Sequence, residues 1–226
     1  MKGKESAAHA AVARIIDGMT VGLGSGSTAE FAIRRIGERI AGGLRIQTVA
    51  SSRKSEALAR SLGIPVSDPE EVDQVDVAID GADEIDADLN LLKGGGGSLL
   101  REKVLAYTSQ EFIVIADKTK LVTHLGSRPV PVEVTPFGLS FTARHLAGLG
   151  ARVSLRRDAE QPFVTDNGNL IIDCRFSLID DVASLDVKLK MIPGVVETGL
   201  FPGKIVTEVL IGAEDGTVNS FPPVVR

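Results

Sequence analysis

The chain has 226 residues, of which 43% are hydrophobic, with a net charge of −5 at pH 7 and a single cysteine. This length allows one large domain or two unequal ones, and a single cysteine excludes an internal disulfide. The sequence has no basic block and only eight Phe and one Tyr, which argues against a nucleic-acid-binding protein. It has no apolar run of the roughly 18 residues that a membrane span needs. We therefore expect a soluble, cytoplasmic protein with no nucleic-acid or membrane partner.

Helical and strand patterns alternate along the first half of the chain. Apolar residues at helical spacing predict a first helix that stops at Asp17 and Gly18. The pattern then predicts strand 20–23, helix 28–40, strand 46–50, helix 54–62, strand 75–79, helix 99–107 and strand 112–116. Strands that alternate with helices pair in parallel through right-handed crossovers. The expected fold class is α/β, a layered Rossmann-like parallel-sheet domain that binds ligands beyond the carboxyl ends of its strands.

Two prolines, Pro129 and Pro131, mark a change in this pattern. The sequence then predicts strand 130–134, helix 139–149, strand 152–155, a turn at 166–168, strand 170–174, helix 182–191 and strand 194–201. This βαββαβ order is typical of a ferredoxin-like fold. A last strand, 206–211, is expected to return to the first sheet because a lone strand needs a partner. We expect an α/β catalytic domain of residues 1–128 and 204–226, and a second, smaller ferredoxin-like α+β domain of residues 129–203.

The first candidate site is the loop of residues 22–28, GLGSGST, between a predicted strand and a predicted helix. Its glycines let backbone amides approach an anion, and the start of a helix adds partial positive charge. Hydroxyl donors come from Ser25, Ser27 and Thr28. The loop lacks the last residue of a dinucleotide fingerprint, the Gly-Lys-Ser/Thr of a Walker loop and the outer glycines of a nucleophile elbow. It predicts a phosphate site, or else an ordinary strand-to-helix turn.

The second candidate site is the acidic segment 80–86, DGADEID, at the carboxyl end of a predicted strand. Asp80 and Asp83 straddle a glycine turn, so both carboxylates can face one pocket and act on neighbouring hydroxyls. The alternative is a solvated acidic turn. The segment also opens like an EF-hand calcium loop, but Leu91 stands at the obligatory glycine and Gly97 at the bidentate glutamate. We therefore exclude calcium.

The third candidate site is the loop of residues 92–98, LKGGGGS, which precedes a predicted helix. Four consecutive glycines carry a large entropic cost on ordering, which indicates a backbone that must approach something closely. Their amides could stabilise a developing oxyanion, and Lys93 would add a full charge. With Ser98 as N-cap, Glu102 lies in or just beyond the first helical turn, where the helix favours an ionised carboxylate. The pattern predicts that Glu102 is a base beside the glycine loop.

Two lysines, Lys118 and Lys120, follow predicted strand 112–116, again at a carboxyl strand end. We expect Lys118 to be solvated, and Lys120 to bind a substrate phosphate or hydroxyl if the other loops converge there. Cysteine and histidine are the residue types that most often bind zinc, but here they are widely spaced and do not predict a zinc site. We interpret all four of them as structural: Cys174, His9, His124 and His145.

Together these segments resemble type A ribose-5-phosphate isomerases. The matching motifs occur in order and in register over nearly the whole chain, at residues 22–28, 80–84, 93–97, 100–103, 117–120, 129–133, 165–169 and 192–196. Ser25 stands where many relatives have threonine, which keeps the hydroxyl. Lys118 and Thr119 replace small or polar residues, which leaves Lys120 in its position.

The resemblance implies interconversion of D-ribose 5-phosphate and D-ribulose 5-phosphate through a cis-enediolate, in the non-oxidative branch of the pentose phosphate pathway. It implies a homodimer or homotetramer that needs no cofactor and no metal. Glu102 would transfer the proton, while Asp80, Asp83 and Lys93 would assist ring opening. The implied substrate contacts are Ser25, Gly26, Ser27, Thr28, Asp80, Gly81, Ala82, Asp83, Lys93, Gly94, Gly95, Gly96 and Lys120.

Three other classes share parts of this pattern. Sugar-phosphate deaminases and CoA transferases have a similar phosphate loop, but Lys93 in its glycine loop, together with Glu102, argues against them. A sugar-phosphate sensor would need a DNA-binding or signalling module, for which the chain has no basic helix. An NADP oxidoreductase stays open because Arg53 and Lys54 could meet the NADP phosphate.

Overall fold

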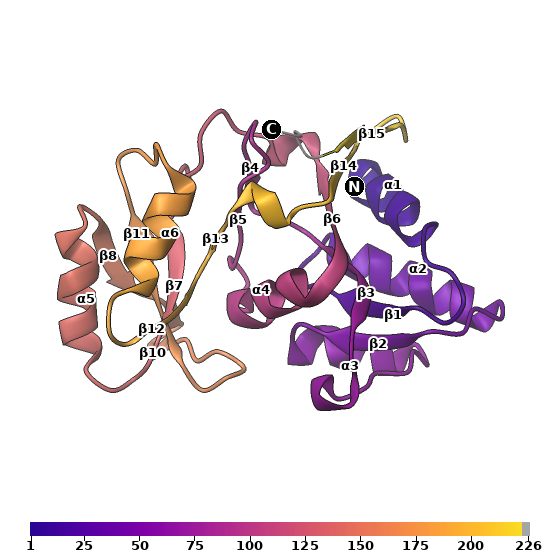
Figure 1. The fold of residues 1–226 in the computed structure, drawn as a ribbon, viewed down its shortest axis with the longest axis horizontal. Coiled ribbons are helices and arrows are strands. Elements are labelled where there is room, and N and C mark those ends of the chain that lie inside the picture. The colour runs from indigo at the N-terminus through magenta and orange to yellow at the C-terminus, as the bar shows by residue number, and fades with distance from the viewer. Residues whose placement is uncertain (223–226) are drawn as a thin grey trace. The chain divides into compact units, whose positions relative to one another are not determined.

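The computed structural model describes residues 1–222 and divides the chain into two compact units (Figure 1). Unit 1 comprises Met1–Ala82, Arg101–Leu121 and the segment from Lys204 onward. Unit 2 comprises Asp83–Leu100 and Val122–Gly203. Residues 223–226, which we assigned to the α/β domain, lie outside the described residues.

Two segments that we had assigned to the α/β domain, residues 83–100 and 122–128, belong to unit 2. The carboxylate of Glu84 accepts hydrogen bonds from the amides of Gly126, at 2.7 Å, and Arg128, at 2.6 Å. These bonds tie the two segments to each other. A small three-stranded sheet also joins the first of them to the later chain, through β4 (Glu84–Ile85), β5 (Leu91–Leu92) and β13 (Leu200–Phe201).

The described part of unit 1 contains a six-stranded sheet in the order β15-β14-β6-β3-β1-β2. All neighbours in it pair in parallel except β15, which runs antiparallel to β14. The last predicted strand does return to this sheet, beside β6, whereas β15 was not predicted. The strands are β1 (Thr20–Leu23), β2 (Gln47–Ala50), β3 (Val75–Asp80), β6 (Ser109–Asp117), β14 (Glu208–Gly212) and β15 (Val218–Phe221).

The helices of unit 1 bury apolar faces against this sheet. Ala11 of the first helix and Ile36 of the second pack with Leu23 of β1 in the main core. Leu105 of the fourth helix packs with Val49 and Val75 in a separate cluster. Burial of one such aliphatic side chain contributes roughly 1.5–3 kcal/mol. The helices are α1 (Lys2–Val12), α2 (Ala29–Ala41), α3 (Arg53–Ser61) and α4 (Leu99–Thr108), with short 3-10 turns at Pro69–Glu71, Lys118–Lys120 and Gly203–Ile205.

The strand order places a change of direction at β1 and β3. From β1 the chain continues outward to β2, and it then returns to β3 on the other side of β1. Connections that leave neighbouring parallel strands in opposite directions open a crevice at the carboxyl ends of those strands, where ligands bind. The loop that follows β1 and Asp80 at the end of β3 are the two candidate segments at this position.

Unit 2 contains a four-stranded antiparallel sheet in the order β12-β7-β11-β8. Its core joins Val132 and Ile172 of the sheet with Leu146 and Leu189 of two helices. The βαββαβ order confirms the ferredoxin-like prediction. Its elements are β7 (Val130–Val134), α5 (Leu139–Gly148), β8 (Arg152–Leu155), β11 (Leu170–Arg175), α6 (Val182–Lys190) and β12 (Val195–Thr198), and a hairpin of β9 (Arg157–Asp158) and β10 (Gln161–Pro162) follows β8.

The prediction of a single strand over residues 194–201 is wrong. The structure divides it at Gly199 into β12, in the four-stranded sheet, and β13, in the three-stranded sheet. A Cβ atom at Gly199 would lie 2.3 Å from the carbonyl oxygen of Lys93. Only glycine allows this close backbone approach, and the periodicity of the flanking apolar residues does not reveal it.

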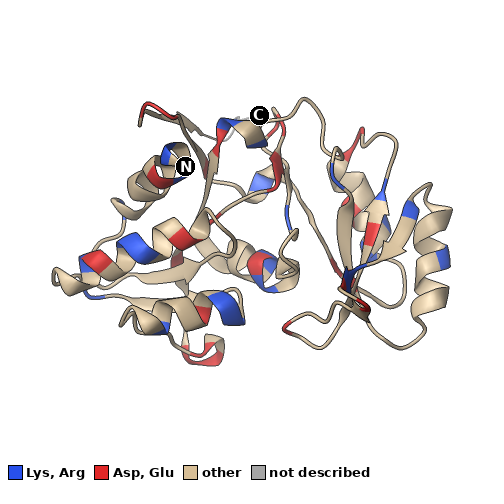
Figure 2. Ribbon diagram, turned by 180° about the vertical axis from the view of Figure 1, so that it is seen from behind, with Lys and Arg blue, Asp and Glu red and all other residues tan. Residues whose placement is uncertain are grey.

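Charged residues of both signs are distributed along the helices in the described part of the chain (Figure 2). This distribution agrees with the absence of a basic block in the sequence. Within residues 1–222, none of the helices has the length and apolar character that crossing a membrane would require.

Candidate active site

Asp80, at the end of β3, lies against the predicted phosphate loop in unit 1. Its side chain is 3% exposed, and its Oδ1 atom accepts hydrogen bonds from the amides of Ser25, at 2.9 Å, and Gly81, at 2.7 Å. A Cβ atom at Gly24 would lie 2.2 Å from the same oxygen. The loop therefore needs glycine at position 24, and the Asp80 carboxylate holds the loop backbone in place.

The hydroxyl of Ser25 belongs to a cluster of serines in unit 1. Its Oγ lies 2.8 Å from the Oγ of Ser51 and 2.9 Å from the Oγ of Ser52. Ser52 caps α3 by accepting from the amide of Ser55, and the Ser55 hydroxyl donates to the carbonyl of Gly24 at 2.7 Å. This network ties the loop to the start of α3. Sequence analysis missed Ser51 and Ser52, although they directly follow a predicted strand at the carboxyl edge.

The exposed part of the loop is formed by Gly26 and Ser27, whereas Thr28 is buried. Gly26 has a φ of +88°, which favours glycine. A Cβ atom at Gly81 would meet the Cβ of Thr28 at 3.6 Å, so the segment after β3 lies against the start of α2. The Nζ of Lys4, on α1, donates to the Oγ of Ser27 at 3.0 Å. Sequence analysis missed Lys4, because nothing in the pattern of the first helix distinguishes it.

Lys120 lies in the 3-10 turn that follows β6. Asp117 caps this turn and accepts hydrogen bonds from the amide and hydroxyl of Thr119. Burial opposes ionisation of Asp117, but these hydrogen bonds and the charges of Lys4 and Lys120 hold the pKa of its carboxyl below the usual value. Both lysines therefore stabilise the ionised form of the Asp117 carboxyl. Lys118 is exposed, as the sequence predicts.

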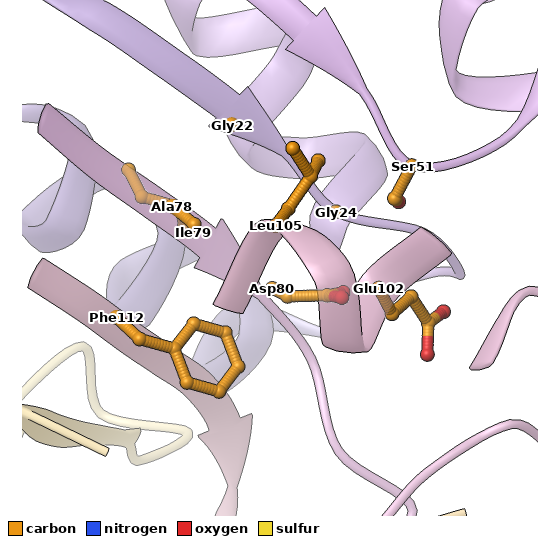
Figure 3. A pocket seen from close by; sticks show the side chains of 9 residues that line it. All are labelled: Gly22, Gly24, Ser51, Ala78, Ile79, Asp80, Glu102, Leu105 and Phe112. Carbon is orange, nitrogen blue, oxygen red and sulfur yellow. The ribbon is translucent and has the colours of Figure 1, made fainter. Parts of the chain in front are cut away.

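Glu102 lies in the first turn of α4 and is 5% exposed. It shares a pocket of unit 1 with Asp80, and both side chains lie beyond the ends of β1 and β3 (Figure 3). A buried carboxylate that faces a pocket at the carboxyl edge of the sheet suits general-base catalysis. The pocket is lined by Gly22, Gly24, Ser51, Ala78, Ile79, Asp80, Glu102, Leu105 and Phe112.

The glycine loop belongs to unit 2, and its conformation explains its composition. Gly94 has a φ of +92° and Gly97 a φ of +87°, a region that favours glycine. The amide of Gly95 donates to the Oδ2 of Asp83 at 2.8 Å, and a Cβ atom at position 95 would lie 2.9 Å from that carboxylate. Glycine at these three positions is therefore required by backbone angle or by close approach.

Lys93 lies in this loop, directly before the four glycines, and is 3% exposed. Its amide donates to the carbonyl of Gly199 at 2.9 Å, and its Nζ lies 5.5 Å from the ring centre of Phe201. The face of an aromatic ring attracts a cation at such a distance, so Phe201 helps to orient the Lys93 side chain. Unit 2 thus contains three of the predicted site residues, namely Lys93, Gly95 and Asp83, of which the last two are joined by a hydrogen bond.

The predicted site residues fall into two groups. Within unit 1 the structure brings together residues 25–28, Asp80, Gly81 and Glu102, with Ala82 as the next residue of that segment. Unit 2 contains Asp83, Lys93 and residues 94–96. That Glu102 and the glycine loop act on the same two carbon atoms stays a prediction.

The acidic segment after Asp83 forms a turn. The Oδ1 of Asp86 accepts hydrogen bonds from the amides of Asp88 and Asn90, both at 2.9 Å. Over the described part of the chain, no three His, Cys, Asp or Glu side chains form a cluster that could hold a metal ion. Cys174 is buried in β11, where burial and the nearby charge of Asp173 raise the pKa of its thiol to about 12.

Comparison with known proteins extends the similarity over nearly the whole chain. Residues 47–216 match the family described as ribose 5-phosphate isomerase A (phosphoriboisomerase A). The chain is 51% identical to ribose-5-phosphate isomerase A of Thermomicrobium roseum over 218 residues, which cover 95% of this chain and 92% of the relative. It is 48% identical to that of Bacillus mycoides, over 96% of this chain and 98% of the relative.

Solved structures agree with this assignment. The ribose 5-phosphate isomerase of Plasmodium falciparum superimposes with a TM-score of 0.93 at 37% identity, over 98% of both chains. A D-ribose-5-phosphate isomerase in complex with phospho-erythronic acid gives a TM-score of 0.92 at 39% identity, over 97% of both chains. The chain belongs to the ribose 5-phosphate isomerase A family.

Proposed function

We propose that this chain interconverts D-ribose 5-phosphate and D-ribulose 5-phosphate in the non-oxidative branch of the pentose phosphate pathway. The observation that carries this proposal is the pocket that the buried carboxylate of Glu102 shares with Asp80. Asp80 in turn holds the loop predicted to bind phosphate. Membership of the family named for this reaction supports the same assignment.

The phosphate of the substrate is assigned to the loop that starts α2. Gly26 and Ser27 are its exposed residues, and a helix N-terminus favours an anion. Lys4 donates a hydrogen bond to Ser27, and the charges of Lys4 and Lys120 both stabilise the ionised Asp117. A cation at the loop, Lys4, favours a phosphate dianion over a neutral sugar group.

The isomerisation moves one proton from C2 to C1 and one from O2 to O1, and it requires no external oxidant or reductant. Glu102 takes the proton from C2 of the open-chain aldose and returns it to C1, while the carbonyl group passes from C1 to C2 through a cis-enediolate. Asp80, Asp83 and Lys93 are assigned to ring opening and to proton transfer among the sugar oxygens. A positioned base of this kind contributes about 10²–10⁴ in rate.

The backbone amides of Gly94 and Gly96 are assigned to the enediolate oxygens, because those of Gly95 and Gly97 donate to Asp83 and to the carbonyl of Gly94. Loss of one preorganised donor to such an oxyanion costs roughly 10²–10³ in kcat. Phospho-erythronic acid, which a solved relative binds, is a four-carbon phosphate with a planar carboxylate. Because this group resembles the planar enediolate in shape and charge, we expect it to inhibit this chain.

We further propose a cytoplasmic homodimer or homotetramer that acts on sugar phosphate without a cofactor. Exposed apolar side chains on or beside the two helices of unit 2 support association, because burying them between subunits would remove apolar surface from water. They are Phe137 (93% exposed), Phe141 (63%), Val187 (60%) and Met191 (77%). Light scattering coupled to size exclusion measures the number of subunits, and a monomer would contradict this part of the proposal.

The direct experiment adds ribose 5-phosphate to the purified protein and follows ketose formation. We expect turnover without added nucleotide and in excess chelator. Glucosamine 6-phosphate tests the deaminase alternative, and binding of NADP tests the oxidoreductase alternative. Absence of ketose from a folded, correctly assembled protein would contradict the proposed function.

A further inference from the structure

We infer that Arg156, held by Asp173, is a positioning residue that sets the direction of the backbone amides in the glycine loop. Both residues and the loop belong to unit 2. The inference rests on the proposed function, because it names how one part of that site is kept in a reactive conformation.

The side chain of Arg156 has two sets of partners. Its Nε and Nη2 donate to the two carboxylate oxygens of Asp173, with Nε to Oδ2 at 3.0 Å. Its Nη1 donates to the carbonyl oxygens of Gly94, at 2.8 Å, and Gly95, at 3.2 Å. The side chains of Arg156 and Asp173 are 16% and 19% exposed, so solvent screens this bidentate pair less than a surface ion pair.

The four-stranded sheet determines where these side chains point. The amide of Arg156 donates to the carbonyl of Ile171 at 2.8 Å, immediately after β8, which places the two residues opposite each other. Asp173 follows Ile171 by two positions on β11 and therefore lies on the same face of the sheet. A Cβ atom at Gly97 would lie 3.6 Å from the Cδ1 of Ile171. The face that carries Arg156 and Asp173 thus packs against the glycine loop.

The contact with two carbonyls has a consequence for the amides. In a trans peptide the carbonyl and the following N–H point in opposite directions. When the carbonyls of Gly94 and Gly95 point at Arg156, the N–H groups of Gly95 and Gly96 point away from it. The hydrogen bond from the Gly95 amide to Asp83 agrees with this direction. The Gly95 amide thus already binds an anionic group, the Asp83 carboxylate, and the Gly96 amide points to the same side of the loop.

A loop of four glycines needs such a constraint, because each residue loses conformational freedom when it is ordered. The planar guanidinium can donate to a carboxylate and to two carbonyls at once, whereas a lysine offers a single ammonium group. Arg156 therefore orients the proposed oxyanion donors through the carbonyl oxygens of the same peptide groups.

The test compares Arg156→Met and Arg156→Lys with Arg157→Met. Arg157 is the adjacent arginine, is exposed, and donates only to the carbonyl of Glu160 among the hydrogen bonds recorded for its side chain in residues 1–222. We expect both Arg156 variants to lose kcat by at least about tenfold, up to the roughly 10²–10³-fold cost of an oxyanion donor. Their KM should change by less than about threefold, because the donors act mainly in the transition state. Arg157→Met should keep both constants.

Two further readouts separate positioning from general destabilisation. Affinity for phospho-erythronic acid should fall by about the same factor as kcat/KM, as expected for an analogue of the intermediate. Guanidinium ion, at concentrations well below those that unfold the protein, should restore part of kcat in Arg156→Met. It should have no effect on Arg157→Met.

The inference is overturned if Arg156→Lys keeps the kcat of the unaltered chain, or if Arg157→Met loses as much as Arg156→Met. If Arg156→Met does not fold, Arg156→Lys and Asp173→Asn decide, and both are expected to lose kcat at nearly unchanged KM. Failure of the proposed function itself is distinguishable, because the unaltered chain would then form no ketose.

Discussion

The Oδ1 atom of Asp80 accepts a hydrogen bond from the amide of Ser25 at 2.9 Å. This contact joins the end of β3 to the loop that follows β1, which are 55 residues apart in the sequence. It connects a carboxylate of the proposed reaction pocket with the backbone of the proposed phosphate site. Changes on either side of the contact should therefore affect both catalysis and substrate binding.

Replacing Gly24 by alanine tests this contact directly. The added Cβ would lie 2.2 Å from the Asp80 carboxylate, so the loop or the carboxylate must move. We expect KM for ribose 5-phosphate to rise by at least about tenfold, equivalent to ~1.4 kcal/mol of binding. Gly148→Ala is the matched control, because a Cβ atom there meets nothing within 4 Å. Equal KM values for the two variants would contradict the role of this contact.

Replacing Glu102 by glutamine tests the proposed base. The amide keeps the size of the side chain but cannot take a proton, so kcat should fall by about 10²–10⁴ while substrate still binds. Steady-state kinetics and a binding measurement on the same preparation separate these two effects. Glu56→Gln is the control, since Glu56 lies at the surface of α3 and pairs with Arg60. Turnover close to that of the unaltered chain would show that the base is another group.

Replacing Lys4 by methionine tests the cationic side of the phosphate loop. Its ammonium group contacts Ser27, and we expect KM to rise by about three- to tenfold with a smaller change in kcat, as for a partly exposed charge. The difference should shrink at high ionic strength because salt screens this attraction. Lys118→Met should have no such effect, since Lys118 is exposed and was predicted to be solvated. A larger loss from Lys118→Met would contradict the assignment.

Asp117 predicts a pH dependence of stability. Its pKa is lower in the folded protein than the usual value of 3.8, so the unfolded chain binds the proton first as pH falls. The carboxylate therefore stabilises the fold fully above about pH 4–5, and this contribution disappears as pH falls through the lowered pKa. Urea unfolding of Asp117→Asn against the unaltered chain should show a difference near neutral pH that vanishes in acid. A difference that grew in acid would contradict the sign of the shift.

Much of the fold could be predicted because its signals are local. The alternation of helical and strand periodicity predicts the parallel sheet, and the later βαββαβ order predicts the antiparallel one. Turn chemistry is also local, which is why the run of glycines at 94–97 predicts a backbone that makes close approaches, whereas its positive φ angles were not predicted. Gly94 and Gly97 adopt such angles, and Gly95 lies against Asp83.

What the sequence could not supply are contacts between segments far apart in the chain. Nothing near Lys4 indicates that its side chain reaches Ser27, and nothing near Arg156 indicates that it contacts the carbonyls of a loop 62 residues earlier. The division of a predicted strand at Gly199 likewise depends on the carbonyl of Lys93.

The sequence by itself thus determined the order of elements, the three loops and the family resemblance, because periodicity, turn residues and motif spacing are read within a few positions of the chain. Only the tertiary structure decided which side chains and backbone groups support those loops. The packing of sheets and helices selects these partners. A shift of one residue in the register of a strand turns its side chains to the opposite face of the sheet and so changes which groups meet.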